Sequence, residues 1–250
     1  STDKTVEILE NFHCINMNTN KLSFGSAAAN FIHLISTFDE YQNFDYVMLS
    51  DQDDIWLPNK IFQAIQKMSE VNACTYFGSF YPWYYKKISY FNIENKYTNY
   101  LHLFGNLSPG FTFSFTSSAF FKIQTIINEK FDHLGELRWH DWLLYFIIKE
   151  YKFKYVISAN ANTLYRQHSN NDTGLATNID AIKMRIKYLF SYEMDKQLNI
   201  LMLFAVQSGS KKLLKCALRL NLTDRFHLLC NLTRLRKSLI SRLALALWII

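Results

Sequence analysis

The sequence predicts an α/β layered fold followed by a helical region, and three patterns support this prediction. Residues 46–49 form an apolar run with the length of a buried strand, and acidic residues follow it directly. Residues 111–115 alternate between phenylalanine and hydroxyl side chains, as a half-buried strand does. From Ile179 onward only helical spacing of apolar residues remains. We therefore expect a layered domain over residues 1–178 and a basic helical region over residues 179–250.

Apolar spacing and helix-start residues place the individual elements of the layered domain. Pro58 suits the first turn of a helix, and Ile61, Ile65 and Met68 then recur at helical spacing. Aromatic residues crowd the segment 75–91, where we expect a strand and a loop. Helices are expected over residues 2–12, 26–38, 58–69, 117–128 and 139–151, and further strands over 14–17, 46–49, 111–115 and 155–158, with a last extended segment at 162–166 before a polar loop.

Composition excludes a disordered or repeat-built chain. Apolar residues make up 49% and aromatic residues 16%, whereas Gly (7) and Pro (3) are few. The four cysteines contain no CxxC pair, so we expect free thiols and no structural zinc site. The net charge of +6 is unevenly spread: residues 179–250 carry 13 Lys and Arg against 4 Asp and Glu, and residues 1–178 carry 14 against 17. The two parts therefore have different tasks.

The most informative motif is the acidic run Asp51-Gln52-Asp53-Asp54, which follows the predicted strand at 46–49. In open α/β sheets, ligands bind at the carboxyl ends of strands. Clustered carboxylates repel one another unless a cation lies among them, and Mg2+ or Mn2+ takes oxygen ligands that include substrate phosphates. The motif therefore indicates a metal–diphosphate site. The alternative is a solvated turn, or a cap for the helix that follows.

Three further segments accompany this motif, and together the four resemble a known family. They read S-T-D-K-T at 1–5, S-D-Q-D-D-I-W-L-P-N-K at 50–60, H-D-W at 140–142 and L-Y-R-Q-H-S-N at 164–170. In order and spacing they resemble the family 2 glycosyltransferases of the GT-A fold, in particular the bacterial rhamnosyltransferase-like branch. The resemblance covers about residues 1–175. It implies a Rossmann-like, three-layer α/β/α sandwich and inverting transfer from a dTDP- or UDP-sugar to a glycan or a lipid-linked oligosaccharide.

The resemblance also implies roles for the residues of the acidic run and of H-D-W. Asp53 matches the metal ligand, and Asp51 matches the residue that contacts the donor ribose or the metal, with Gln52 between them on the donor side. Asp141 matches the base that takes the proton of the acceptor hydroxyl. Trp139, His140 and Trp142 surround Asp141 and are expected to contact the acceptor. The alternative for Asp141 is a helix N-cap.

Other positions receive roles from the same resemblance. His168 matches a metal or diphosphate ligand, although an ordinary loop histidine is an equal alternative. Arg166 is expected to bind the donor diphosphate, with a surface ion pair as the alternative. Gly110 and Thr112 lie in P-G-F-T, which resembles the segment that lines the acceptor side of the family's site; the alternative is a turn before a strand.

The chain departs from the family pattern at its start. The family opens with strands that end in Asp-Asp-Gly-Ser, and Ser1 matches that Ser, so the acids and strands before it are not in this sequence. We therefore expect a GT-A fold that lacks its first strands, with an uncovered sheet edge. A rival hypothesis is an inactive glycosyltransferase remnant that acts as a scaffold.

The basic region predicts contact with an anionic membrane. Lys211, Lys212, Lys215 and Arg219 recur on one helical face, opposite Leu213 and its apolar neighbours. Such a helix suits a cytoplasmic enzyme held peripherally at the inner face of the bacterial cytoplasmic membrane. The alternatives are a helical subdomain with a solvated basic face, or a basic membrane-binding module as the main function. No nucleic-acid-binding motif accompanies the charge, so no nucleic-acid partner is expected.

Overall fold

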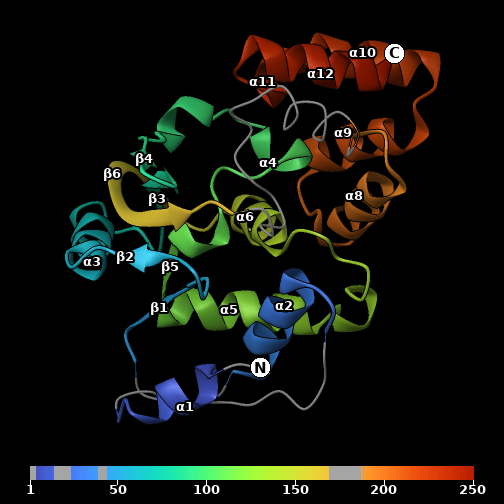
Figure 1. Ribbon diagram of the computed structural model, residues 1–250. Helices are drawn as coiled ribbons and strands as arrows, with labels where there is room; N and C mark the ends of the chain where they lie inside the picture. The colour runs from blue at the N-terminus through green and yellow to red at the C-terminus, as the bar shows by residue number, and fades with distance from the viewer. Residues whose placement is uncertain (1–3, 14–23, 39–43, 169–186, 188) are drawn as a thin grey trace.

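The structure is a computed structural model that describes residues 4–13, 24–38, 44–168, 187 and 189–250 (Figure 1). Its strands are β1 (Tyr46–Met48), β2 (Ile55–Trp56), β3 (Thr75–Tyr84), β4 (Lys87–Ile88), β5 (Phe113–Thr116) and β6 (Tyr155–Arg166). Its helices are α1 (Thr5–Glu10), α2 (Ala27–Thr37), α3 (Lys60–Glu70), α4 (Leu101–Phe104), α5 (Ser117–Asn128), α6 (His140–Glu150), α8 (Tyr192–Phe204), α9 (Ser208–Arg219), α10 (Leu222–Cys230), α11 (Leu232–Leu235) and α12 (Leu239–Ile249).

One mixed, curled sheet forms the centre of the molecule, in the order β1-β5-β3-β6-β2, with β4 paired to β3 (Figure 1). The two long central strands, β3 and β6, run parallel. β5 is antiparallel to both of its neighbours, and β2 is antiparallel to β6. β1 is the end strand of the described sheet. Because β5 is antiparallel to both β1 and β3, β1 runs in the same direction as β3 and β6. The acid loop after β1 (residues 51–54) and the end of β6 therefore lie at the same edge of the sheet.

Alternate residues of β3 face two different helical layers, as a strand buried on both faces requires. Tyr76 packs with Ala64 and Met68 of α3 in a small cluster on one face. Phe77 faces the large core on the other side, where its ring lies edge-on to Phe113 at 4.8 Å and to Tyr145 of α6 at 5.5 Å. The sheet therefore has α3 on one face and α6, with α2 and α5 beside it, on the other.

The predicted α/β class is confirmed, and most elements lie close to their expected ranges. The side chains of Ser26 and Thr116 cap α2 and α5 by accepting backbone N–H bonds at 3.1 and 3.3 Å. The strand expected at 111–115 begins at Phe113, because Gly110–Thr112 forms a 3-10 turn after Pro109. The extended segments expected at 155–158 and 162–166 are one strand, β6. The strand expected at 14–17 and the boundary at 178 lie outside the described residues.

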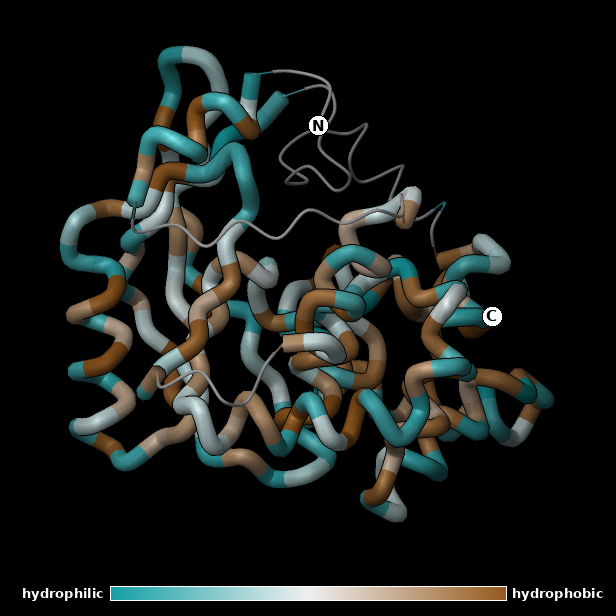
Figure 2. Tube along the Cα trace, turned by 90° about the horizontal axis from the view of Figure 1, so that it is seen from below, coloured by the Kyte–Doolittle hydropathy of each residue, from teal (hydrophilic) through white to brown (hydrophobic). Residues whose placement is uncertain are grey.

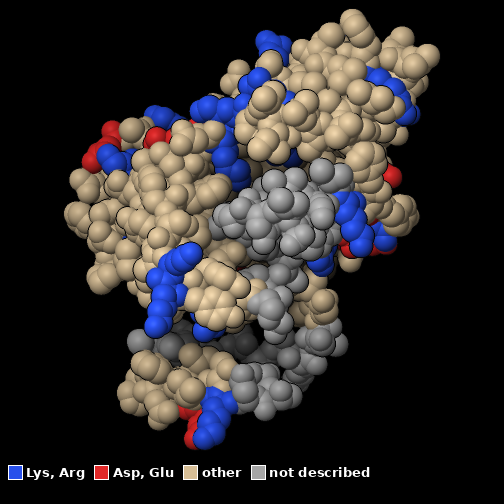
Figure 3. Space-filling view, turned by 45° about the horizontal axis from the view of Figure 1, so that its top comes forward, with Lys and Arg blue, Asp and Glu red and all other residues tan. Residues whose placement is uncertain are grey.

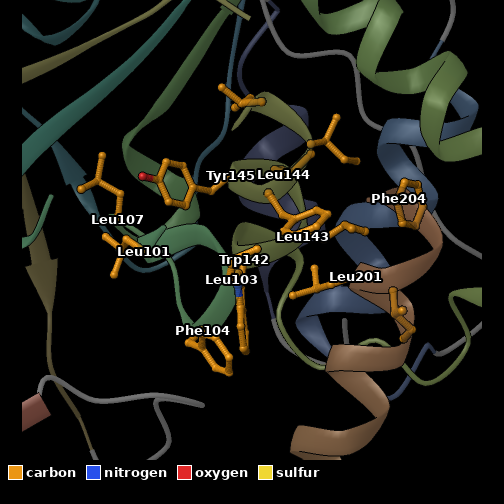
Figure 4. Packing of buried hydrophobic residues seen from close by; sticks show 14 of the residues in the cluster. Leu101, Leu103, Phe104, Leu107, Trp142, Leu143, Leu144, Tyr145, Leu201 and Phe204 are labelled. Carbon is orange, nitrogen blue, oxygen red and sulfur yellow. The ribbon is translucent and has the colours of Figure 1, made fainter. Parts of the chain in front are cut away.

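The C-terminal helices share the core of the sheet-containing part. Leu198, Leu201 and Phe204 of α8 are fully buried and pack in the same cluster as α6. Figure 4 shows side chains of α6 between those of residues 101–107 and those of α8. In Figure 2 hydrophobic stretches run through both parts of the molecule. The free cysteines among the described residues (Cys74, Cys216 and Cys230) agree with the expected thiols.

A buried carboxylate joins α6 to the C-terminal helices. Glu150 at the end of α6 is 1% exposed, and it accepts the backbone N–H groups of Val206 and Gln207 at 2.9 Å each. Its other oxygen contacts His102 Nε2 at 3.3 Å. These donors, led by His102, hold the pKa of Glu150 below its ordinary value although burial alone raises it.

Candidate active site

The acid loop lies between β1 and β2, and the pairing of β2 with β6 brings it to the end of β6. Ile55 pairs with Leu164, and the Leu57 N–H donates to Asn162 O at 2.9 Å. Asp54 Oδ1 then accepts the backbone N–H of Arg166 at 3.2 Å. Two segments that the sequence separates by more than a hundred residues therefore form one surface.

Asp53 and His168 are in direct contact within this surface. Asp53 Oδ2 lies 2.7 Å from His168 Nε2, so the structure brings together two of the three residues expected to bind a metal. Gln52 and Arg166 lie on the exposed part of the same surface. Asp54 caps no helix, because the N-cap of α3 is Asn59, which makes no side-chain capping bond.

The acid loop is electrostatically strained. Burial and, after it, the charge of Asp53 raise the pKa of Asp51 to about 6 against the opposing charge of Lys60. Burial likewise raises the pKa of Asp54 to about 7, although the N–H of Arg166 opposes the shift. Asp54 Oδ2 is buried without a hydrogen-bond partner in the described part of the chain. A cation or a donated hydrogen bond at this loop would therefore be strongly stabilised.

Lys60 is a buried cation whose charge acts on Asp51 and Asp54 of the acid loop. It is 5% exposed, and its Nζ donates to Phe111 O and to Thr163 Oγ1, both at 2.7 Å. The ammonium also lies 4.4 Å from the ring centroid of Trp56. Burial lowers the pKa of Lys60 to about 8, whereas Asp54 and Asp51 oppose that change. Lys60 thus connects the acid loop, the P-G-F-T segment and β6.

Asp141 lies in the first turn of α6, which begins at His140, so it is not the N-cap of that helix. Its Oδ1 accepts the N–H of Trp142 at 2.8 Å, and its Oδ2 accepts Asn106 Nδ2. Burial raises the pKa of Asp141 to about 6, the two hydrogen bonds lower it, and the negative charge of Asp51 raises it. The charge of Asp51 therefore acts on Asp141, which places the acid loop within electrostatic reach of H-D-W.

The P-G-F-T segment packs directly against H-D-W. A Cβ placed on Gly110 would lie 2.8 Å from His140 Nε2 and 3.6 Å from Asp141 Cβ. The absence of a side chain at Gly110 thus permits close approach to His140. The His140 ring stacks on Phe31 at 4.3 Å, and burial lowers its pKa to about 4, so it is neutral at ordinary pH.

The remaining residues expected on the acceptor side differ in accessibility. Trp139 is partly buried, with its ring 5.8 Å from that of Trp142. Trp142 is 5% exposed, and its Nε1 donates to His102 O at 2.6 Å, as in a core residue. Thr112 is 3% exposed, and its hydroxyl bonds to Ser108 Oγ and Pro109 O, both at 2.8 Å. Of these three side chains, only Trp139 is accessible enough to contact a bound molecule.

A divalent cation fits part of this donor set. In the described part of the chain, no group of three or more His, Cys, Asp and Glu side chains is gathered closely enough to hold a metal ion. Asp53 and His168 nevertheless offer an oxygen and an imidazole nitrogen in contact with each other. Mg2+ is commonly held by one or two protein carboxylates together with substrate phosphates, so a diphosphate would complete such a site.

Two residues that shape the site were not predicted from the sequence. Lys60 stands at the end of the quoted acidic motif, and its position two residues after Pro58 signalled only a helix start. Asn106 lies in the segment F-G-N-L-S-P-G, whose composition indicates a turn and gives no further signal.

Curated proteins include a relative of this chain. The chain is similar to a glycosyltransferase, to which it is 31% identical over 182 residues. That relative is the "dTDP-rhamnosyl transferase RfbG" of Shigella flexneri; the match covers 70% of this chain and 62% of the relative. The matched part thus spans less than two thirds of the relative's length. No protein-family model matches the chain.

Proposed function

We propose that this chain carries the catalytic site of an inverting family 2 glycosyltransferase with the GT-A three-layer arrangement. The observation that carries the proposal is the convergence of the acid loop and Asp141, whose pKa is raised by burial and by Asp51. Because its Shigella flexneri relative is named a dTDP-rhamnosyl transferase, dTDP-rhamnose is the first donor to test. The acceptor would be a glycan or a lipid-linked precursor of a surface polysaccharide or lipopolysaccharide.

The proposed reaction is a single displacement in which Asp141 acts as the base. The acceptor hydroxyl oxygen forms a bond to the anomeric carbon while the bond from that carbon to the diphosphate oxygen breaks. The hydroxyl proton passes to the Asp141 carboxylate, and the electron pair leaves with the nucleoside diphosphate. A base with a pKa of about 6 is ionised at neutral pH, yet it is a stronger proton acceptor than an ordinary Asp.

The acid loop would receive the donor diphosphate. Asp53 and His168 would hold Mg2+ or Mn2+, Asp51 and Gln52 would face the ribose side, and Arg166 would lie beside the diphosphate. The bound cation would neutralise the charge that develops on the leaving diphosphate. Lys60 keeps the loop folded by partly compensating Asp51 and Asp54.

Transfer assays with dTDP-rhamnose, UDP-sugars and Mn2+ test this proposal. Asp141→Asn should reduce transfer about 10²–10⁴-fold and leave donor binding unchanged, because only the proton acceptor is lost. Asp53→Ala should instead abolish metal-linked dTDP binding measured by calorimetry. Asp132→Asn, at an exposed position outside the site, is the matched control. Metal-independent binding of dTDP, or equal transfer by the Asp141 variant, would refute the assignment.

The rival hypothesis is an inactive remnant that serves as a scaffold, and the same assays separate the two. A remnant would bind neither dTDP nor a dTDP-sugar with Mn2+, and the variants would not differ from the parent chain. The strained acid loop favours the enzyme, because a scaffold gains nothing from buried carboxylates with raised pKa values.

We also propose peripheral contact with an anionic membrane, now through α10 and α12. The apolar face of α9, which the sequence suggested for this contact, is buried: Leu213, Leu214 and Ala217 pack inside the protein. On α12, by contrast, an exposed apolar row is formed by Leu239, Leu243 and Leu247. Exposed Leu222 and Phe226 of α10 and exposed Arg234 and Lys237 beside α12 add to this surface, and Figure 3 shows Lys and Arg side chains among neutral ones over the C-terminal helices.

Vesicle sedimentation tests the membrane proposal. Among the described residues, no helix is long and apolar enough to cross a bilayer. Binding through exposed leucines and basic side chains should be reversible and sensitive to salt. Vesicles with phosphatidylglycerol should bind the chain, and Leu243→Ser with Leu247→Ser should weaken binding. The matched control is Ile61→Ser with Phe62→Ser, at exposed apolar positions of α3. Equal binding to neutral vesicles in high salt would contradict the proposal.

A further inference from the structure

Asn106 is the side chain through which the rest of the fold holds Asp141. Its Nδ2 donates to Asp141 Oδ2 and to Ser108 O, the latter at 3.2 Å. Because the Trp142 N–H occupies Oδ1 at 2.8 Å, both carboxylate oxygens have a fixed donor. The carboxylate plane is thereby set, with one lone pair of each oxygen left for other partners.

Residues 100–105, which precede Asn106, are hydrogen-bonded to the C-terminal region. Arg236 Nη2 donates to Phe104 O, and the Tyr100 N–H donates to Arg234 O at 3.1 Å. Gly105 makes room for the first contact, since a Cβ there would lie 2.7 Å from Arg236 Nη1. Residues 100–105 are therefore fixed by α11 and by the residue that follows it.

We propose that Asn106 is the positioning residue of Asp141, and that Arg236 holds Asn106 in place from the C-terminal region through Phe104 and Gly105. This inference rests on the proposed function for its catalytic consequence only. The geometry that carries it is the unbroken line of contacts Arg236–Phe104–Gly105–Asn106–Asp141, in which each step is a hydrogen bond or a peptide bond.

The charged groups around Asp141 define how this arrangement can be detected. Asp51 of the acid loop faces it with a negative charge, Lys96 faces it with a positive charge, and neighbouring His140 is buried and neutral. The hydrogen bond from Asn106 favours the ionised carboxylate and so lowers its pKa against the effect of burial. Loss of Asn106 must therefore move the titration of Asp141 to higher pH.

The direct test is a carbon-detected NMR titration of aspartate carboxyl groups in the full chain, with Asp141 assigned by its loss in Asp141→Asn. Asn106→Ala should raise the pKa of Asp141 by about one pH unit, the size expected for one hydrogen bond to a charged group. Asn199→Ala, which removes an exposed Asn bonded to Asp195 O, should leave it unchanged. An unaltered pKa in Asn106→Ala would overturn the proposal.

A double-variant cycle tests the part played by Arg236. Arg236→Ala should raise the pKa of Asp141 by less than Asn106→Ala does, and it should have no further effect once Asn106 is replaced. Gly105→Ala, whose methyl group displaces only the flexible guanidinium, should reproduce Arg236→Ala in a folded chain. An equal effect of Arg236→Ala with and without Asn106 would mean action through space by its charge, which refutes the proposed line of contacts.

Activity supplies the catalytic readout and keeps the two proposals distinguishable. In transfer assays the acidic limb of the pH profile should move upward by the same amount as the NMR pKa, because protonated Asp141 cannot accept a proton. If the parent chain transfers no sugar, the proposed function fails while the NMR titration still decides the role of Asn106. If transfer occurs and Asn106→Ala lowers it equally at every pH, the positioning role is refuted.

Discussion

Replacing Asp54 by Asn is expected to stabilise the fold at neutral and alkaline pH. Asp54 Oδ1 accepts the Arg166 N–H, and an amide oxygen can keep that bond. Its Oδ2 is buried without a hydrogen-bond partner among the described residues, so no hydrogen bond stabilises the charge at that oxygen. The substitution therefore removes a poorly compensated charge and retains the contact that joins the acid loop to β6.

The size of the effect follows from the pKa of Asp54. A rise from 3.8 to about 7, caused first by burial, corresponds to about 4 kcal/mol at ~1.4 kcal/mol per pH unit. Solvent reaches part of the side chain, and the neighbouring acids adjust their protonation, so we expect about half of this, ~2 kcal/mol. In a chain of this length that corresponds to a rise in Tm of about 4–8 °C.

The pH dependence has a definite sign. Because the pKa of Asp54 is higher in the folded than in the unfolded chain, the folded chain binds more protons between these two values, and its stability falls as pH rises through the window. The advantage of Asp54→Asn should be absent near pH 4, grow to about pH 7 and stay constant above it. Urea unfolding at several pH values in metal-free buffer measures this difference.

Two results would refute this reasoning. One is an Asp54→Asn chain that is no more stable than the parent at pH 8, and the other is a stability difference that does not shrink toward pH 4. Asp132→Asn, at an exposed position, should change stability by less than ~0.5 kcal/mol at any pH.

Three further predictions concern the supports of the site. Lys60→Met leaves two buried acceptors unpaired and the acids uncompensated, so it should destabilise the chain by roughly 3 kcal/mol in urea unfolding; exposed Lys67→Met should change little, and equal effects would contradict the buried role. Glu150→Ala leaves two backbone N–H groups unpaired, so amide exchange in α8 and α9 should accelerate more than in β3; uniform acceleration would argue against a local tie. Gly110→Ala forces its methyl group against His140, so it should lower the free energy of unfolding by roughly 1–3 kcal/mol and lower the Tm with it. An unchanged Tm would show that the His140 ring moves aside without cost.

The sequence predicted the elements that local patterns define. The helices α2, α3, α5 and α6 end within a few residues of their expected bounds, because apolar spacing and cap residues are local signals. The two-residue strand β2 was not predicted, because it exists only through its pairing with distant β6. β5 begins later than expected because Gly110–Thr112 forms a 3-10 turn. Phe111 is fully buried in this turn, although its place in the alternating pattern predicted a strand residue.

The candidate site was predicted only in part, because sequence motifs identify residues but not the contacts between distant segments. The resemblance named Asp53 and His168, and the structure brings them into contact. Lys60 matters because its ammonium donates to acceptors from two remote segments. Asn106 matters because the C-terminal region holds residues 100–105 in place. Local composition cannot predict either contact. All the roles assigned to site residues remain predictions, including those of Asp53, His168 and Asp141.

The hydrogen bonds between residues 100–105 and the C-terminal helices determine which parts of such chains can be exchanged in a chimaera. A chimaera that joined residues 1–178 to an unrelated C-terminal region would uncover the apolar side of α6 that α8 now covers, and would also lose the donors to Phe104 O and Glu150. Such exchanges should give insoluble products unless segment 100–106, α6 and the C-terminal helices are transferred together. Within this fold, segment 100–106, α6 and the C-terminal helices must therefore be exchanged together.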